Sequence, residues 1–192
     1  MSFELPALPY DAKALEPHLS RALVQRRHGE LQRACLARLN RLVAGTPWAE
    51  RPLEAILLGA EGEIAQQAAQ AWALTFHWHS LAPRSGAPGD ALAAAIEARW
   101  GGLEGLRAAM AVAVVDGPAG GWAWLVRDGE GVALMMGEAG SVPLSRGLTP
   151  LLALRLADAP DTQGPAALAA FWALANWRFA TTNFSGPAAP RR

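Results

Sequence analysis

The stretch GWAWLV at residues 121–126 marks the point at which the character of this chain changes from helical to extended. Its run of aromatic and branched apolar residues is typical of a buried strand, and the Asp128-Gly129 pair after it predicts a tight turn into a second strand over 132–136. A third strand is expected over 149–156. These short strands, close together in sequence, predict a small antiparallel sheet in the second half of the chain.

Helical periodicity dominates the chain before this stretch, and one further helical segment follows the strands. The expected helices cover residues 20–43, 52–58, 61–80 and 90–100, then the segment from the Gly101-Gly102 break to about 115, and finally 166–180. Residues 160–165 are expected to form a loop. The first and third helices, with the short one between them, predict a helical hairpin.

Residues 81–89 contain two prolines and two glycines and make the best linker in the chain. We therefore predict an N-terminal alpha-hairpin domain over 1–84 and a C-terminal α/β domain over 85–192. The fold class expected from this layout is α+β, with the three-stranded antiparallel sheet in the second domain.

The composition suits a compact folded protein, because 52% of the residues are hydrophobic and only 18% are charged. Lysine plus arginine and aspartate plus glutamate number 17 each, so no net charge favours nucleic acid or an acidic membrane. Cys35 is the single cysteine, which excludes an internal disulfide. With neither a secretory signal nor a long apolar run apparent, a cytoplasmic location is expected.

Seven short segments, in order along the chain, resemble the iron/manganese superoxide dismutase family. They are LPALPY at 5–10, ALEPH at 14–18, AQAW at 69–72, TFHW at 75–78, GWAWL at 121–125, TPLL at 149–152 and FWALANW at 171–177. The resemblance extends from about Phe3 to Phe184. It implies the family fold, in which a long helical hairpin precedes an α/β half and the metal cavity lies between the two.

The same resemblance implies that the metal ligands are missing. Members of the family hold iron or manganese with three histidines and one aspartate, and these positions fall here at Arg27, Leu74, Arg155 and Ala159. A protonated guanidinium has no lone pair to donate, and leucine and alanine side chains have no donor atom. We therefore predict no metal cofactor and no catalytic residue.

Part of the family's active-site surround is retained. Gln70 falls at the position of the glutamine that hydrogen-bonds the metal-bound solvent in iron-type members, and Trp124 and Trp177 are also kept. Tryptophans at these positions have a structural reason to persist, because their rings fill core volume.

Other parts of the surround are altered. The family's tyrosine gate falls at Cys35, its histidine pair falls at Leu31 and Gln32, and the stretch that helps to build the family's dimer contact is shortened and replaced by 160–164. Cys35 has no expected base beside it and is interpreted as a buried, inert thiol rather than a nucleophile. The tryptophans of 121–126 lack basic neighbours and are interpreted as core rather than as a base-stacking surface.

Two other kinds of site are considered. A relocated metal site would draw on His28, His77 and His79 with Asp158 or Asp161, but the histidine spacings do not share a helix face, so surface or satisfied histidines are the favoured interpretation.

An anion site would use Arg27 and Arg155, which should approach the same cavity if the family backbone is preserved. Pairing of these arginines with Glu30 or Asp158, or exposure to solvent, is the favoured alternative.

The function predicted from the sequence is that of a catalytically inactive member of the family with a structural, binding or regulatory role. The alternative is an active superoxide dismutase with an unconventional metal site. Expected partners are a second copy of the chain or another protein, such as a genuine superoxide dismutase subunit, and neither nucleic acid nor membrane.

Overall fold

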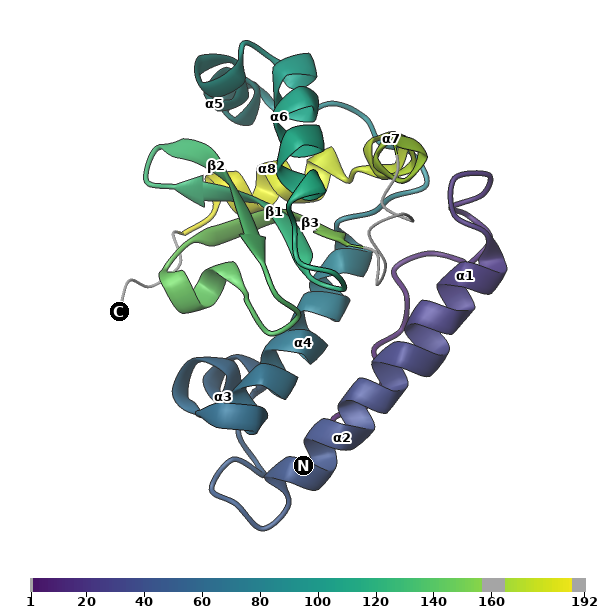
Figure 1. Cartoon of the computed structure of the whole chain (residues 1–192), viewed down its shortest axis with the longest axis vertical. Coiled ribbons are helices and arrows are strands. Elements are labelled where there is room, and N and C mark those ends of the chain that lie inside the picture. The colour runs from purple at the N-terminus through teal and green to yellow at the C-terminus, as the bar shows by residue number, and fades with distance from the viewer. Residues whose placement is uncertain (1, 157–164, 188–192) are drawn as a thin grey trace.

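The first half of the chain is a helical hairpin. The computed structural model describes residues 2–156 and 165–187. Its first helices are α1 (Arg21–Gln25), a π-helical segment (Arg26–Gln32), α2 (Arg33–Val43), α3 (Leu53–Gly59) and α4 (Gly62–His79). Helix α1, the π-helical segment and α2 form one continuous helix that lies beside α4 (Figure 1). Helix α3 packs against α4 near the turn of the hairpin (Figure 1). No helix in the described ranges is long and apolar enough to cross a membrane.

The second half contains the sheet and its covering helices. Its elements are α5 (Asp90–Trp100), α6 (Leu103–Val115), β1 (Trp122–Asp128), β2 (Gly131–Gly137), a 3-10 turn (Pro143–Arg146), β3 (Thr149–Arg155), α7 (Pro165–Leu174) and α8 (Trp177–Ser185). The strand order is β2-β1-β3, with both pairings antiparallel. The α+β fold class predicted from the sequence is confirmed.

Residues 122–126 of the central strand β1 are buried on both faces, which explains the unbroken apolar run there. Trp122, Trp124 and Val126 pack into the cluster built with the helical hairpin. Ala123 and Leu125, which alternate with them, pack into the second cluster, which includes residues of α5 and α6. The period of two along a strand thus divides the side chains of β1 between the two cores.

Each of the two hydrophobic clusters contains residues from both predicted domains. Trp78 and Leu81 from the first half belong to the cluster of the second half, while Trp122 and Trp124 belong to the cluster of the first. The backbone also joins the halves, because the amide of Asn176 donates to the carbonyl of Ser80 at 2.8 Å. The division at residue 84 stays a prediction, and its two parts share their cores.

The last helix differs from its prediction. A single helix was expected over 166–180, but the structure has α7 and α8 with a break at Ala175 and Asn176. The Asn176 side chain accepts a hydrogen bond from the amide of Phe179 at 3.1 Å and donates one to the carbonyl of His79 at 2.9 Å. Asn176 therefore caps α8 and ties it to the end of α4. Residues 160–164 of the predicted loop lie outside the described residues.

The π-helical segment was not predicted either. It interrupts the helix expected over 20–43 and contains Gly29. At its end Gln32 is fully buried, where it donates to the hydroxyl of Thr75 at 2.9 Å and accepts from the indole of Trp78 at 2.8 Å. The wider turns of a π-helix change the direction in which the following side chains point, and such turns are frequent at functional sites. This segment carries Arg27.

Candidate functional site

A cavity of about 330 Å³ lies where the helical hairpin meets the second half. Its polar wall comes from three elements, with Arg27 on the π-helical segment, His77 on α4 and Arg155 at the end of β3. His18 lies at the same cavity and is exposed. Helix α7 supplies the opposite wall through Phe171 and three alanines.

The structure brings together two of the four positions at which the resemblance places metal ligands. Arg27 and Arg155 line this cavity, whereas Leu74 is 1% exposed and packs in the core of the hairpin. Ala159 lies outside the described residues.

The described residues that line this cavity do not fit iron or manganese. These ions take imidazole and carboxylate donors in such sites, whereas Arg27 and Arg155 bring two cations and no lone pair. Within residues 2–156 and 165–187, no group of three or more histidine, cysteine or acidic side chains is placed to hold a metal ion. That the ligand set has been lost stays a prediction.

His77 lines this cavity, whereas the sequence interpretation considered it only for a relocated metal site and favoured a surface or satisfied histidine. It is 3% exposed, and its Nδ1 lies 2.8 Å from the carbonyl oxygen of Ala153. A carbonyl only accepts, so Nδ1 carries the hydrogen and Nε2 presents a lone pair, which has no hydrogen-bond partner among the described residues. The sequence interpretation was that this histidine lies at the surface or has its hydrogen bonds satisfied. It is wrong for Nε2, which is buried and has no partner among the described residues. The sequence signal that could have indicated this place is that His77 lies about one helical turn after Leu74, a position that the resemblance assigns to a metal ligand.

Burial lowers the pKa of His77 to about 4, because an imidazolium would lose its hydration there. The hydrogen bond to Ala153 opposes this shift, while the charges of Arg27 and Arg155 lower the pKa further. At neutral pH the ring is therefore neutral. It brings no charge to a cavity lined by two cations, and its Nε2 is a buried acceptor.

The other histidines considered for a relocated metal site point to different places. His28 donates through Nε2 to the carbonyl of Pro6 at 2.7 Å and sets its ring against the edge of Trp78. His79 is exposed and stacks on Phe179. Asp158 and Asp161 lie outside the described residues. His28, His77 and His79 thus do not converge.

The retained residues of the family's surround lie apart from this cavity. Gln70 lines a separate, larger depression about two turns earlier along α4, together with Gln66, Gln67 and residues of the loop after β2. Trp124 is fully buried against Trp72, Phe76 and Trp122. Trp177 is buried in the second cluster and stacks on Trp172 at 6.0 Å between ring centroids. The tryptophans serve the core, as expected from their size.

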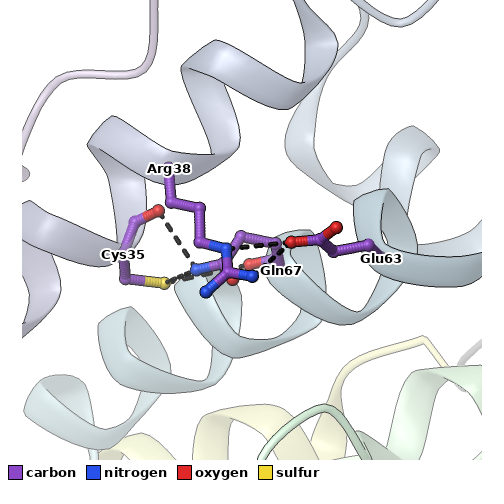
Figure 2. A network of polar contacts seen from close by, with 4 residues as sticks. All are labelled: Cys35, Arg38, Glu63 and Gln67. Atoms are coloured by element: carbon purple, nitrogen blue, oxygen red, sulfur yellow. Dashed lines mark hydrogen bonds and ion pairs between the residues drawn. The ribbon is translucent and has the colours of Figure 1, made fainter.

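Cys35 is held in a hydrogen-bonded link between the two long helices (Figure 2). The side-chain nitrogen of Gln67 donates to its sulfur at 2.9 Å and to its carbonyl at 3.2 Å. Burial raises the pKa of the Cys35 thiol to about 11, although the hydrogen bond from Gln67 and the charge of Arg38 oppose the shift. An adjacent ion pair joins Arg38 to Glu63 at the surface. A thiol with so high a pKa is a poor nucleophile at neutral pH.

The pKa of His77 gives a testable pH dependence. The pKa of His77 in the folded chain lies below its unfolded value of about 6.5. The stability that the neutral ring contributes is therefore fully present above pH 6.5, and it is lost as the pH falls to about 4. Between pH 7 and pH 4.5 the unaltered chain should lose about 2–3 kcal/mol more than a His77→Gln variant, which cannot titrate there. Among the described residues, the ionisable groups at the same cavity are Arg27, Arg155 and His18. Denaturant unfolding at the two pH values measures the difference.

The control for this experiment is His79→Gln, which removes an exposed histidine two residues away. Its stability should fall between the two pH values as much as that of the unaltered chain. Equal losses in the unaltered chain and the His77→Gln variant would show that His77 is not held neutral by its surroundings.

The fold and the cavity together define an α+β protein in which a long helical hairpin and a three-stranded sheet enclose a polar site between them. Two family models match the chain: iron/manganese superoxide dismutases, alpha-hairpin domain, over residues 2–82, and the C-terminal domain of the same enzymes over 88–183. The chain belongs to the iron/manganese superoxide dismutase family, and the resemblance seen in the sequence is confirmed.

Curated relatives match the chain over nearly its whole length. The chain is 37% identical to the protein named superoxide dismutase (Fe) of Coxiella burnetii, a match that covers 96% of this chain and 99% of the relative. Proteins of the same name from Pseudoalteromonas translucida and Escherichia coli are 36% and 35% identical, each covering 96% of this chain and 100% of the relative.

Proposed function

We propose that this chain is a non-catalytic member of the iron/manganese superoxide dismutase family that keeps the scaffold for a structural, binding or regulatory role. The observation that supports this most strongly is the pair of guanidinium groups, Arg27 and Arg155, at one cavity where the resemblance places metal ligands. Association with a second copy or with an active dismutase subunit stays a prediction.

The physical reason lies in what superoxide dismutation requires. The reaction alternately reduces and oxidises one centre, and ordinary side chains offer no suitable couple for this. A divalent or trivalent cation would also meet two positive charges in place of imidazole and carboxylate donors. At the aspartate position alone, exchange of a carboxylate for the guanidinium of Arg155 changes the local charge by two units.

An active dismutase with an unconventional metal site is the competing function. Its support is the name of the relatives, which are called iron superoxide dismutases at 35–37% identity. Against it, His28, His77 and His79 lie in three different environments and share no position for an ion.

Metal content and superoxide consumption, measured on the same sample, test the proposal. The chain would be purified from cells supplied with iron and manganese, in parallel with the Coxiella burnetii relative as the active control. We expect only trace metal in this chain and no consumption above the rate without protein. Near-stoichiometric iron or manganese, with metal-dependent consumption, would establish the competing function instead.

A further inference from the structure

We propose that the cavity lined by Arg27, His77 and Arg155 binds a small carboxylate that also carries a hydroxyl group, such as a 2-hydroxycarboxylate. This inference rests on the proposed function, in which no metal ion occupies that space. The carboxylate would lie against the guanidinium groups, and the hydroxyl would donate to Nε2 of His77.

The charge of the cavity supports an anionic ligand. Arg27 and Arg155 are both half-buried and approach from different elements. No described residue that lines the cavity is acidic, and the exposed Glu30 lines an adjoining depression with the same two arginines. The planar guanidinium fork matches the two oxygens of a carboxylate. Each arginine also takes part in a further interaction of the folded chain, so a ligand would add to these contacts or exchange with them.

The second, independent observation is Nε2 of His77, a fully buried polar atom without a hydrogen-bond partner among the described residues. A buried acceptor left without a donor is costly, so a group that donates to it is favoured. Because Nδ1 already donates to Ala153, Nε2 can only accept. Acetate or chloride would bring charge but no donor. A hydroxyl on the ligand supplies the missing hydrogen.

The remaining walls limit the size of the ligand. Leu19, Leu23, Leu154 and Phe171 give the cavity apolar sides, and its volume of about 330 Å³ is at the lower end of the usual range for small-molecule sites. Such a space suits a short carbon skeleton between the polar groups. Long acyl chains and nucleotides would not fit.

Calorimetric titration with glycolate, acetate and chloride at constant ionic strength tests this inference on the unaltered chain. Glycolate and acetate differ mainly by the hydroxyl, so glycolate should bind more tightly, by about tenfold for one additional buried hydrogen bond. Chloride should give no heat beyond dilution. Equal binding of glycolate and acetate would overturn the assignment of the hydroxyl to His77, and the absence of any anion binding would overturn the site.

Three substitutions, one of them a control, locate the binding. Arg27→Gln should weaken glycolate binding by about 10- to 100-fold, the usual range for one charge-assisted hydrogen bond. Arg26→Gln removes the same charge from the exposed neighbouring residue and should leave binding unchanged. His77→Phe should make glycolate and acetate bind equally. Equal losses in Arg26→Gln and Arg27→Gln would show nonspecific charge attraction and overturn the site.

Metal analysis of the titrated sample separates failure of this inference from failure of the proposed function. Iron or manganese in near-stoichiometric amount would contradict the proposed function itself. A metal-free chain that binds no anion would overturn the carboxylate site alone, and the proposed function would stand.

Discussion

A variant that carries Arg27→His, Leu74→His, Arg155→Asp and Ala159→His together is expected to purify with iron or manganese, where the unaltered chain carries only traces. These exchanges supply the three imidazoles and one carboxylate that the resemblance assigns to the metal. They also remove two cations from the cavity between the halves. Metal analysis after growth in supplemented medium measures the gain.

Superoxide consumption by this variant should stay about 10- to 100-fold below that of the Coxiella burnetii relative, the usual cost of altered groups around a metal site. The surround remains that of this chain, with Cys35 in place of the family's tyrosine and Gln70 at a different depression.

The matched control contains the same three histidines with Arg155→Asn in place of Arg155→Asp. Asparagine has nearly the size of aspartate and removes the same cation, but it brings no negative charge. The control should hold much less metal than the full variant. Equal metal in both would show that the carboxylate position is not where the resemblance places it.

Trp124→Ala is expected to be the most destabilising single substitution considered, at about 3–5 kcal/mol, the range for a large aromatic residue removed from a core. Trp124 is fully buried in β1 and contacts Trp72 and Phe76 of α4, so its loss leaves a cavity between the sheet and the hairpin. In a domain of this size the melting temperature should fall by about 10 °C. Denaturant and thermal unfolding measure the change.

Trp124→Phe is the control for this cavity. It keeps an aromatic ring, although a smaller one than the indole, and the indole nitrogen that it removes has no hydrogen-bond partner among the described residues. The phenylalanine variant should therefore lose less than half of what the alanine variant loses. An alanine variant as stable as the unaltered chain would show that the contact between β1 and α4 contributes little.

The fold could be predicted because most of its helices and strands are indicated by short stretches of local sequence. The GWAWLV stretch needs two buried faces, and in the structure β1 lies at the centre of the sheet with its side chains shared between two cores. The turn at Asp128-Gly129 joins β1 to β2 as expected. The first helix begins after the capping residue Ser20, whose hydroxyl accepts from the amide of Leu23.

The features that could not be predicted depend on contacts far apart in sequence. The break between α7 and α8 is favoured by the hydrogen bond from Asn176 to His79, which is 97 residues away. The π-helical segment ends at Gln32, which is bonded to Thr75 and Trp78 on α4. A continuous helix satisfies the local pattern at both places, and only the folded chain supplies the competing partners.

For the candidate site, the resemblance predicted that Arg27 and Arg155 approach one cavity, and the structure places both there. It did not predict that His77 lies among them, because a histidine beside Trp78 is equally compatible with a place on the surface. The unsatisfied Nε2 arises from the fold, since Ala153 of β3 engages only the other ring nitrogen.

X-ray diffraction at the iron and manganese absorption edges, from crystals grown with both metals present, tests the central claim most directly. An anomalous difference map locates a bound ion whatever atoms hold it. We expect no peak in the space bounded by Arg27, His77 and Arg155. An iron or manganese peak there would contradict the proposal that this chain has given up the metal chemistry of its family.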